Sequence, residues 1–119
     1  MNRVILMGRL ARDPETQTTV TGKLKCRMTI AVDRPKAKDG TQSADFISLV
    51  AWERTAEFSE KYLSKGQRIL VEGRITTGSY EKDGVKKYTT DVVCDRIEFA
   101  DGKRQDREEE DDIPIDIPM

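Results

Sequence analysis

Apolar and polar residues alternate along several stretches of this chain, which is the period of a β-strand with one buried face. The clearest alternation covers residues 24–32, where apolar side chains predict a core face and the intervening positions predict a basic face. Weaker alternation predicts strands over residues 2–10, 46–52 and 67–77. Gly8 interrupts the first of these and predicts a bend or bulge there.

Turn signals separate these strands and add a last hairpin. Asp83-Gly84 predicts a tight turn that joins residues 79–82 to a strand over residues 85–99. Residues 13–15 and 21–23 predict shorter turns, and the polar residues 33–44 predict a long hairpin loop.

One segment changes to helical spacing. Residues 55–64 place apolar side chains four and seven apart, and Gly66 stands where a C-terminal cap is expected. Five strands with one short helix between the third and fourth predict an all-β fold of the OB type. In this fold a five-stranded, partly open barrel binds oligonucleotides or oligosaccharides.

The strand over residues 46–52 has two useful faces. Its aliphatic face predicts core, whereas the other face carries an aromatic at each end, Phe46 and Trp52. Six residues at about 3.3 Å each place these rings roughly 20 Å apart, a spacing that suits stacking of several bases. The same pattern also allows Trp52 to be the one buried tryptophan of a small core, and Phe46 to be buried too. The residues alone leave both possibilities open.

The predicted hairpin around Asp83-Gly84 interleaves rings and charges. Tyr80 lies near Lys82, Lys86 and Lys87, which is the composition expected of a nucleic-acid-binding finger. The alternative is a solvated hairpin with ordinary cross-strand tyrosines, Tyr88 included.

The charge divides the chain in two. Residues 1–104 hold 20 basic and 15 acidic side chains, a balance of +5, while residues 105–119 hold 1 basic and 7 acidic, a balance of -6. We therefore expect a basic domain over residues 1–104 that suits a polyanion, and a disordered acidic tail over residues 105–119.

Composition excludes several kinds of chemistry. The chain has no histidine, so a Ser-His-Asp triad or a histidine metal site is impossible, and no phosphate-binding glycine loop occurs. We expect no enzyme activity, no cofactor and no metal. Cys26 and Cys94 stand far apart, as expected of reduced, buried thiols in a cytoplasmic protein, and no signal peptide or membrane segment is evident.

Four runs in this order resemble bacterial and phage single-stranded DNA-binding proteins: NRVILMGRLARDPE, DFISLVAWERTAEFSEKYLSKGQRILVEGRI, SYEKDGVKKYTTDVVCDRIEF and a final DDIPIDIPM. The resemblance implies an OB-fold that assembles through its first strand and sheet faces into a homotetramer. It also implies that the protein coats single-stranded DNA in replication, recombination and repair, associated with the nucleoid. It implies base stacking by Phe46, Trp52 and Tyr80. The basic residues expected to contact phosphate are Arg3, Arg34, Lys36, Arg54, Lys65, Lys82, Lys86 and Lys87.

The acidic end resembles the family's protein-docking tip, which implies recruitment of replication, recombination and repair proteins. The residues of this tip are Asp111, Asp112, Ile113, Pro114, Ile115, Asp116, Ile117, Pro118 and Met119.

This chain also departs from the family pattern. Residues 33–36 lack the loop aromatic of many members, residues 76–79 lack the usual basic charge, the linker before the tip is short, and Met119 stands where phenylalanine is usual. These departures favour the alternative of a protein-interaction adaptor whose barrel binds little DNA. An RNA-binding OB domain of the cold-shock type is a further alternative, although the chain lacks the dense aromatic strand motif of those domains.

Overall fold

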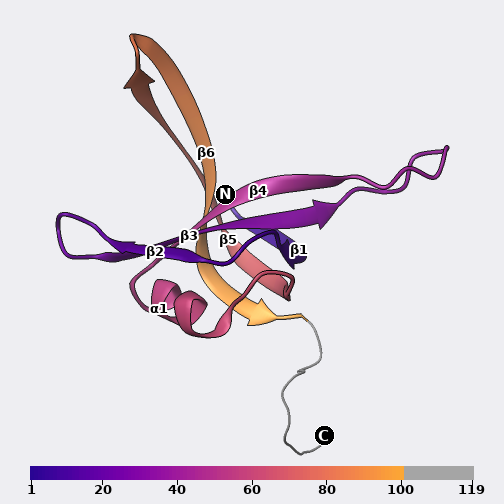
Figure 1. Cartoon of the computed structure of the whole chain (residues 1–119), viewed down its shortest axis with the longest axis horizontal. Helices are drawn as coiled ribbons and strands as arrows, with labels where there is room; N and C mark the ends of the chain where they lie inside the picture. The colour runs from indigo at the N-terminus through magenta and orange to yellow at the C-terminus, as the bar shows by residue number, and fades with distance from the viewer. Residues whose placement is uncertain (101–119) are drawn as a thin grey trace, which may run out of the picture.

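The computed structural model describes residues 1–100, which form six β-strands and one α-helix (Figure 1). The elements are β1 (Val4–Leu10), β2 (Glu15–Thr18), β3 (Leu24–Asp33), β4 (Ala44–Trp52), α1 (Glu53–Tyr62), β5 (Arg68–Lys82) and β6 (Val85–Phe99). Within these residues no helix is long and apolar enough to cross a membrane. The predicted acidic tail and its tip lie outside the described residues.

Five of the strands close a ring in the order β1-β5-β6-β4-β3, and β3 returns to β1. The ring is irregular because two of its strand pairings are short. Strands β4 and β6 are parallel and match at two positions, and β1 meets β3 at two positions. This arrangement agrees with the predicted OB-fold, a partly open barrel with one short helix.

Strand β2 is a sixth strand that the sequence did not predict. It pairs with β3 alone, and thus lies at the sheet edge outside the ring. Its sequence, ETQT, has no apolar alternation, because an edge strand that buries little surface needs none. The predicted turn at residues 21–23 joins β2 to β3, where Gly22 adopts a positive φ of 87°.

Strand β1 changes partner at Arg9, next to Gly8, where the sequence predicted a bend. It pairs with β5 from Val4 to Arg9, and with β3 through Arg9 and Leu10. A Cβ added to Gly8 would lie 2.2 Å from the carbonyl oxygen of Ala31. Glycine is therefore required at residue 8 because the backbones of β1 and β3 approach closely. The register shift lies elsewhere, between β5 and β6 at Glu72/Gly73.

The helix begins and ends two residues earlier than predicted. Leu63 is its C-cap, so the prediction of Gly66 as the cap is wrong. Gly66, with a φ of 91°, instead donates its backbone N–H to the carbonyl oxygen of Leu10 at 2.8 Å. Ala56 is fully buried and Phe58 packs against the core, so the apolar spacing does face the barrel as predicted.

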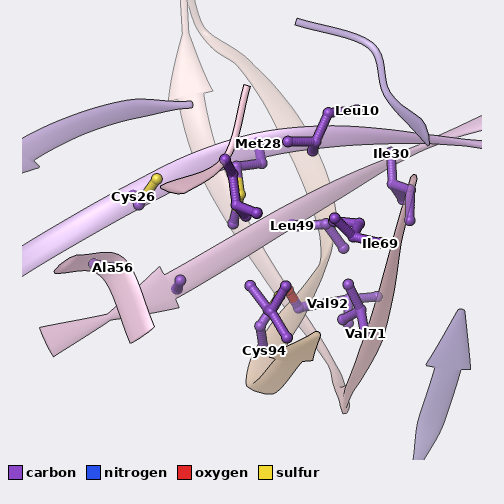
Figure 2. Close-up of a cluster of buried hydrophobic side chains, with 13 residues drawn as sticks. Leu10, Cys26, Met28, Ile30, Leu49, Ala56, Ile69, Val71, Val92 and Cys94 are labelled. Atoms are coloured by element: carbon purple, nitrogen blue, oxygen red, sulfur yellow. The ribbon is translucent and has the colours of Figure 1, made fainter. Parts of the chain in front are cut away.

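The core fills the ring with small and medium aliphatic side chains (Figure 2). Strand β3 contributes Met28 and Ile30, and β4 contributes Leu49 and Ala51, as the period of two predicted. Both cysteines, Cys26 and Cys94, are free and buried in this core.

Burial makes both thiols hard to ionise. Removal from water raises the pKa of Cys26 to about 11, with Glu60 adding a smaller increase, and raises the pKa of Cys94 to about 12. The thiolate is the reactive form, so both cysteines are expected to resist a thiol reagent at pH 8 in the folded protein and to react readily in urea. Rapid labelling of the folded protein would contradict this placement.

The raised pKa values of the two thiols also predict how stability depends on pH. Since the folded protein keeps protons that the unfolded chain loses above pH 9, its stability is expected to fall as the pH rises beyond that value.

Candidate nucleic-acid interface

The outward face of β4 lies beside the polar face of β3. Residues directly opposite each other in adjacent strands point to the same side of the sheet. The register therefore assembles one continuous surface, called here the β3–β4 face, from four pairs: Phe46 with Ala31, Ser48 with Thr29, Val50 with Arg27, and Trp52 with Lys25.

The two predicted stacking rings of β4 lie at the ends of this face. Phe46 is 69% exposed, so its ring is accessible to a base that stacks on it. Trp52 is half-buried and lies outside the core cluster. Of the two possibilities that the sequence left open for Trp52, the structure therefore excludes a tryptophan buried in the core. The Nζ of Lys25 lies 5.3 Å from the centroid of its ring. A cation thus stands at the ring where a phosphate would follow a stacked base.

The centre of the β3–β4 face is apolar and flanked by arginines. Val50 is only 5% exposed although it points away from the core cluster. It matches Arg27 on β3 and Val93 on β6, and Val93 in turn matches Arg74 on β5. The row across the sheet is therefore Arg27, Val50, Val93 and Arg74.

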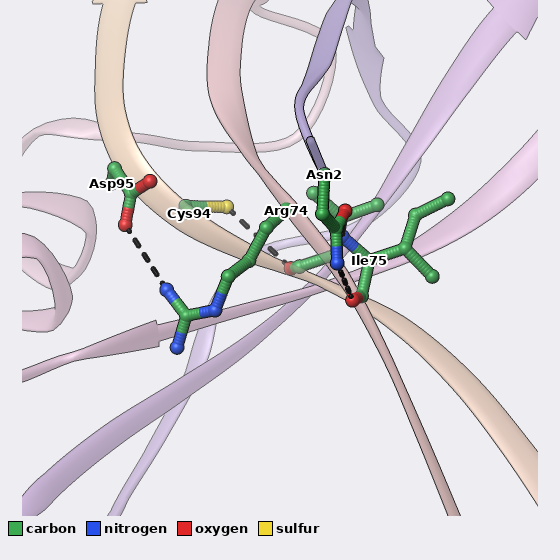
Figure 3. Close-up of polar contacts among 6 residues, drawn as sticks. Asn2, Arg74, Ile75, Cys94 and Asp95 are labelled. Atoms are coloured by element: carbon green, nitrogen blue, oxygen red, sulfur yellow. Dashed lines mark hydrogen bonds and ion pairs between the residues drawn. The ribbon is translucent and has the colours of Figure 1, made fainter.

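The two arginines of this row differ in their contacts. Arg27 is exposed, whereas the Nη1 of Arg74 lies 3.5 Å from a carboxylate oxygen of Asp95 (Figure 3). Arg12 lies on the same face, since its guanidinium donates to the hydroxyl of Thr29 at 3.2 Å. Both ion-paired and free guanidinium groups present N–H donors suited to phosphate oxygens.

Lys25, Arg27 and Arg74 are not among the residues that the sequence predicted to bind. The sequence did indicate Lys25 and Arg27 indirectly, because both occupy polar positions of the alternating residues 24–32, which predict a basic face. No such signal existed for Arg74, because its place depends on the parallel match of β4 with β6 and on the register between β6 and β5.

The β5–β6 hairpin projects from the ring (Figure 1) and confirms the predicted turn. Asp83 and Gly84 have φ values of 53° and 77°, as a two-residue hairpin turn with two positive φ angles requires. Tyr80 is 53% exposed and lies opposite Lys87. Lys82 is two residues further along the same strand, so Tyr80, Lys82 and Lys87 share one side of the hairpin.

The loop between β3 and β4 is where the sequence predicted phosphate contacts by Arg34 and Lys36. Arg34 instead pairs with Asp45, its Nε at 2.8 Å and its Nη2 at 2.6 Å from the same oxygen. This contact holds the pKa of Asp45 below its usual range and ties the two ends of the loop together. Lys36 is exposed.

The remaining predicted basic residues are spread over the surface. The Nη2 of Arg3 lies 3.4 Å from Glu72 on β5, a strand that pairs with neither β3 nor β4. Arg54 is exposed in the first turn of α1, two residues after Trp52. Lys65 is exposed after α1, where its backbone N–H donates to Asp13. The structure therefore joins Phe46 and Trp52 on one face and leaves the predicted cations around it.

Comparison with known proteins places the chain in a family. The profile described as "Single-strand binding protein family" matches residues 1–100. The chain is 48% identical to a single-stranded DNA-binding protein of Clostridium tetani over 88% of this chain and 74% of that protein. It is 42% identical to single-stranded DNA-binding protein 2 of Clostridium acetobutylicum, over 98% of this chain and 90% of that protein.

A third relative comes from another genus. Single-stranded DNA-binding protein 1 of Staphylococcus aureus is 43% identical over 93% of this chain and 72% of that protein. This family is defined by binding, so its match confirms both the resemblance inferred from the four sequence runs and the prediction of a nonenzymatic protein. The chain belongs to the single-strand binding protein family.

Proposed function

We propose that this protein coats and protects single-stranded DNA, without regard to base sequence, in replication, recombination and repair. The observation that carries this proposal is the β3–β4 face, where exposed Phe46 and half-buried Trp52 flank an apolar centre that has arginines on both sides. Rings of this kind stack on any base, since every base has a π-face.

The same face suits a phosphate backbone. Lys25 and Arg27 lie on one side of β4, and Arg74 lies on the other, across β6. A strand that follows β4 therefore has cations on both sides of its bases. Each neutralised phosphate releases condensed counterions, so affinity should fall as salt rises, with a slope of about -0.7 per phosphate contact.

A competition experiment tests the proposal. A fluorescein-labelled oligo-dT bound to the protein is expected to be displaced by unlabelled single strands of any sequence, and poorly by the corresponding duplex, because paired bases cannot stack on Phe46 and Trp52. Equal displacement by duplex and single strand would indicate a general polyanion surface. No binding by either would favour the adaptor function, in which the barrel binds proteins.

The roles of individual residues follow from their positions. We infer base stacking by Phe46, Trp52 and Tyr80. We expect phosphate contacts from the exposed side chains of Lys36, Arg54, Lys65, Lys82, Lys86 and Lys87, together with Lys25 and Arg27. Arg3 and Arg34 already face Glu72 and Asp45, so a phosphate would have to compete with a carboxylate for either guanidinium.

We propose that the protein self-associates through β1, as a homotetramer. The middle of the outward face of β1 is apolar, with Ile5 63% and Met7 56% exposed between Arg3 and Arg9. Met7 lies opposite Leu70 on β5. Exposed apolar side chains in a row along one strand are typical of a protein interface. Sedimentation of the protein gives its mass in solution, and a monomer at micromolar concentration would contradict this part of the proposal.

We further propose that residues 105–119 recruit partner proteins in the cytoplasm through their acidic tip. Deleting these residues is expected to raise the apparent affinity for single-stranded DNA at low salt, because a tail with a charge of -6 competes for the basic face. The same deletion should abolish capture of replication and repair proteins.

The tail experiment has an internal control. At high salt the full-length and truncated proteins are expected to bind DNA equally, because screening weakens the competition. If the truncated protein still captured partners, the barrel and not the tip would select them.

A further inference from the structure

The β5–β6 hairpin has two separate faces beyond the ring. Strand β1 pairs with β5 only up to Gly73, and β4 pairs with β6 only at Val92 and Val93. From Gly78 to the turn, the two hairpin strands therefore pair only with each other among the described strands. Figure 1 shows this arm standing clear of the other elements.

The register assigns the hairpin side chains to these faces. Tyr80 and Lys87 are directly opposite and share the first face with Lys82. Tyr88 is one residue beyond Lys87 and lies opposite Ser79, so it belongs to the other face. Tyr80 and Tyr88 thus point to opposite sides of one two-stranded ribbon.

The face of Tyr88 repeats the chemistry of the Tyr80 face. Tyr88 is 77% exposed, the most exposed aromatic side chain among the described residues. The Nζ of Lys86 lies 5.6 Å from the centroid of its ring, much as Lys25 lies over Trp52. An exposed ring with an ammonium group over it provides both parts of a stacked nucleotide site, since the other face of the ring can take the base and the cation can take its phosphate.

We propose that Tyr88 and Lys86 form a second single-stranded DNA site, on the face of the hairpin opposite Tyr80. This inference rests on the proposed function. One base cannot contact both tyrosines, so a continuous strand has to pass around the Asp83-Gly84 turn or across an unpaired edge of the hairpin to occupy both faces, or two segments have to bind at once. Single-stranded DNA is favoured over a protein partner because the site pairs one ring with one cation and lacks a contiguous apolar patch.

Charge makes the second face the weaker of the two. Glu81 lies opposite Lys86, so this face carries one positive and one negative side chain, whereas Lys82 and Lys87 give the Tyr80 face two positive charges. The Tyr88 site is therefore expected to fill only when the strand is longer than the β3–β4 face and the Tyr80 face can hold.

The test compares binding of two lengths of oligo-dT to the full-length protein. Tyr88→Ala is expected to leave the affinity for strands of about 8 nucleotides unchanged and to weaken binding of strands several times longer at least fivefold, about the loss for one stacked base. Tyr88→Phe should bind like the parent protein, because stacking requires the ring and not the hydroxyl. Glu81→Gln should strengthen binding of the long strand only.

A photocrosslink locates the contact directly. Long strands carrying 5-iododeoxyuridine are expected to give adducts on Tyr88 as well as on Tyr80, whereas short strands should leave Tyr88 unmodified. If the parent protein binds neither length, the proposed function itself fails. If it binds both while Tyr88→Ala matches it at every length and no adduct forms on Tyr88, only this inference is overturned. A Tyr88→Ala protein that loses self-association but keeps long-strand binding would assign the face to a second copy of the chain and overturn the inference as well.

Discussion

Replacing Trp52 by alanine is expected to weaken binding of oligo-dT by about 1–3 kcal/mol, the scale of one lost base stack. Trp52 ends the β3–β4 face, and Lys25 lies over its ring, so the substitution removes a stacking surface and the group that positions a neighbouring cation. The measurement is fluorescence anisotropy of a labelled strand across a range of salt concentrations.

Three comparisons make this result specific. Trp52→Phe should recover most of the affinity, because a smaller ring still stacks. Lys25→Ala should lower the salt slope by about 0.7, whereas Trp52→Ala should leave the slope nearly unchanged, since only the lysine neutralises a phosphate. Tyr62→Ala removes an exposed ring from α1 and should bind like the parent protein. Unchanged affinity in Trp52→Ala, with its thermal midpoint preserved, would show that Trp52 does not stack.

Replacing Gly8 by alanine is expected to destabilise the fold at the upper end of the usual overpacking cost, about 3 kcal/mol. The new Cβ would lie 2.2 Å from the carbonyl oxygen of Ala31 and 3.0 Å from its carbonyl carbon. These are backbone atoms, so the clash can be removed only if β1 moves away from β3. The pairing of β1 with β3 is one of the two short pairings that close the ring. In a domain of this size the thermal midpoint should fall by roughly 10–20 °C.

Gly78→Ala is the matched control for this substitution. Its added Cβ would meet only the side-chain hydroxyl of Thr89, at 3.2 Å, in the projecting part of the hairpin. A rotation of Thr89 relieves that contact, so the thermal midpoint should change little. If Gly8→Ala melted like the parent protein, the contact between β1 and β3 would contribute little to stability.

The strands that bury one side could be predicted from sequence because burial imposes a period of two. Residues 24–32 and 46–52 show this directly, and the structure buries Met28, Ile30 and Leu49 as their alternation required. Strand β2 could not be predicted, because it adds hydrogen bonds at an edge without burying an apolar face. The predicted end of the helix was two residues too late, because it relied on Gly66 as the C-cap. Gly66 instead donates its backbone N–H to Leu10 and does not end α1.

The candidate binding face was predictable only within single strands. The sequence placed Phe46 and Trp52 on one face because both lie on β4, two and eight residues after its start at Ala44. Arg27 and Arg74 join the face through pairings between strands far apart in sequence, and neither a period nor a motif specifies such a register. For the same reason the sequence did not predict that Arg34 pairs with Asp45, because this contact depends on how the loop closes.

The most direct test of single-strand binding by the β3–β4 face is a titration of intrinsic tryptophan fluorescence with oligo-dT of increasing length. Trp52 is the only tryptophan in the chain, so the signal comes from this face alone. We expect quenching that saturates, strengthens with strand length up to a limit, and shifts to higher DNA concentration as salt is raised. Unchanged fluorescence together with unchanged anisotropy of the DNA would contradict the assignment of this face to single-stranded DNA.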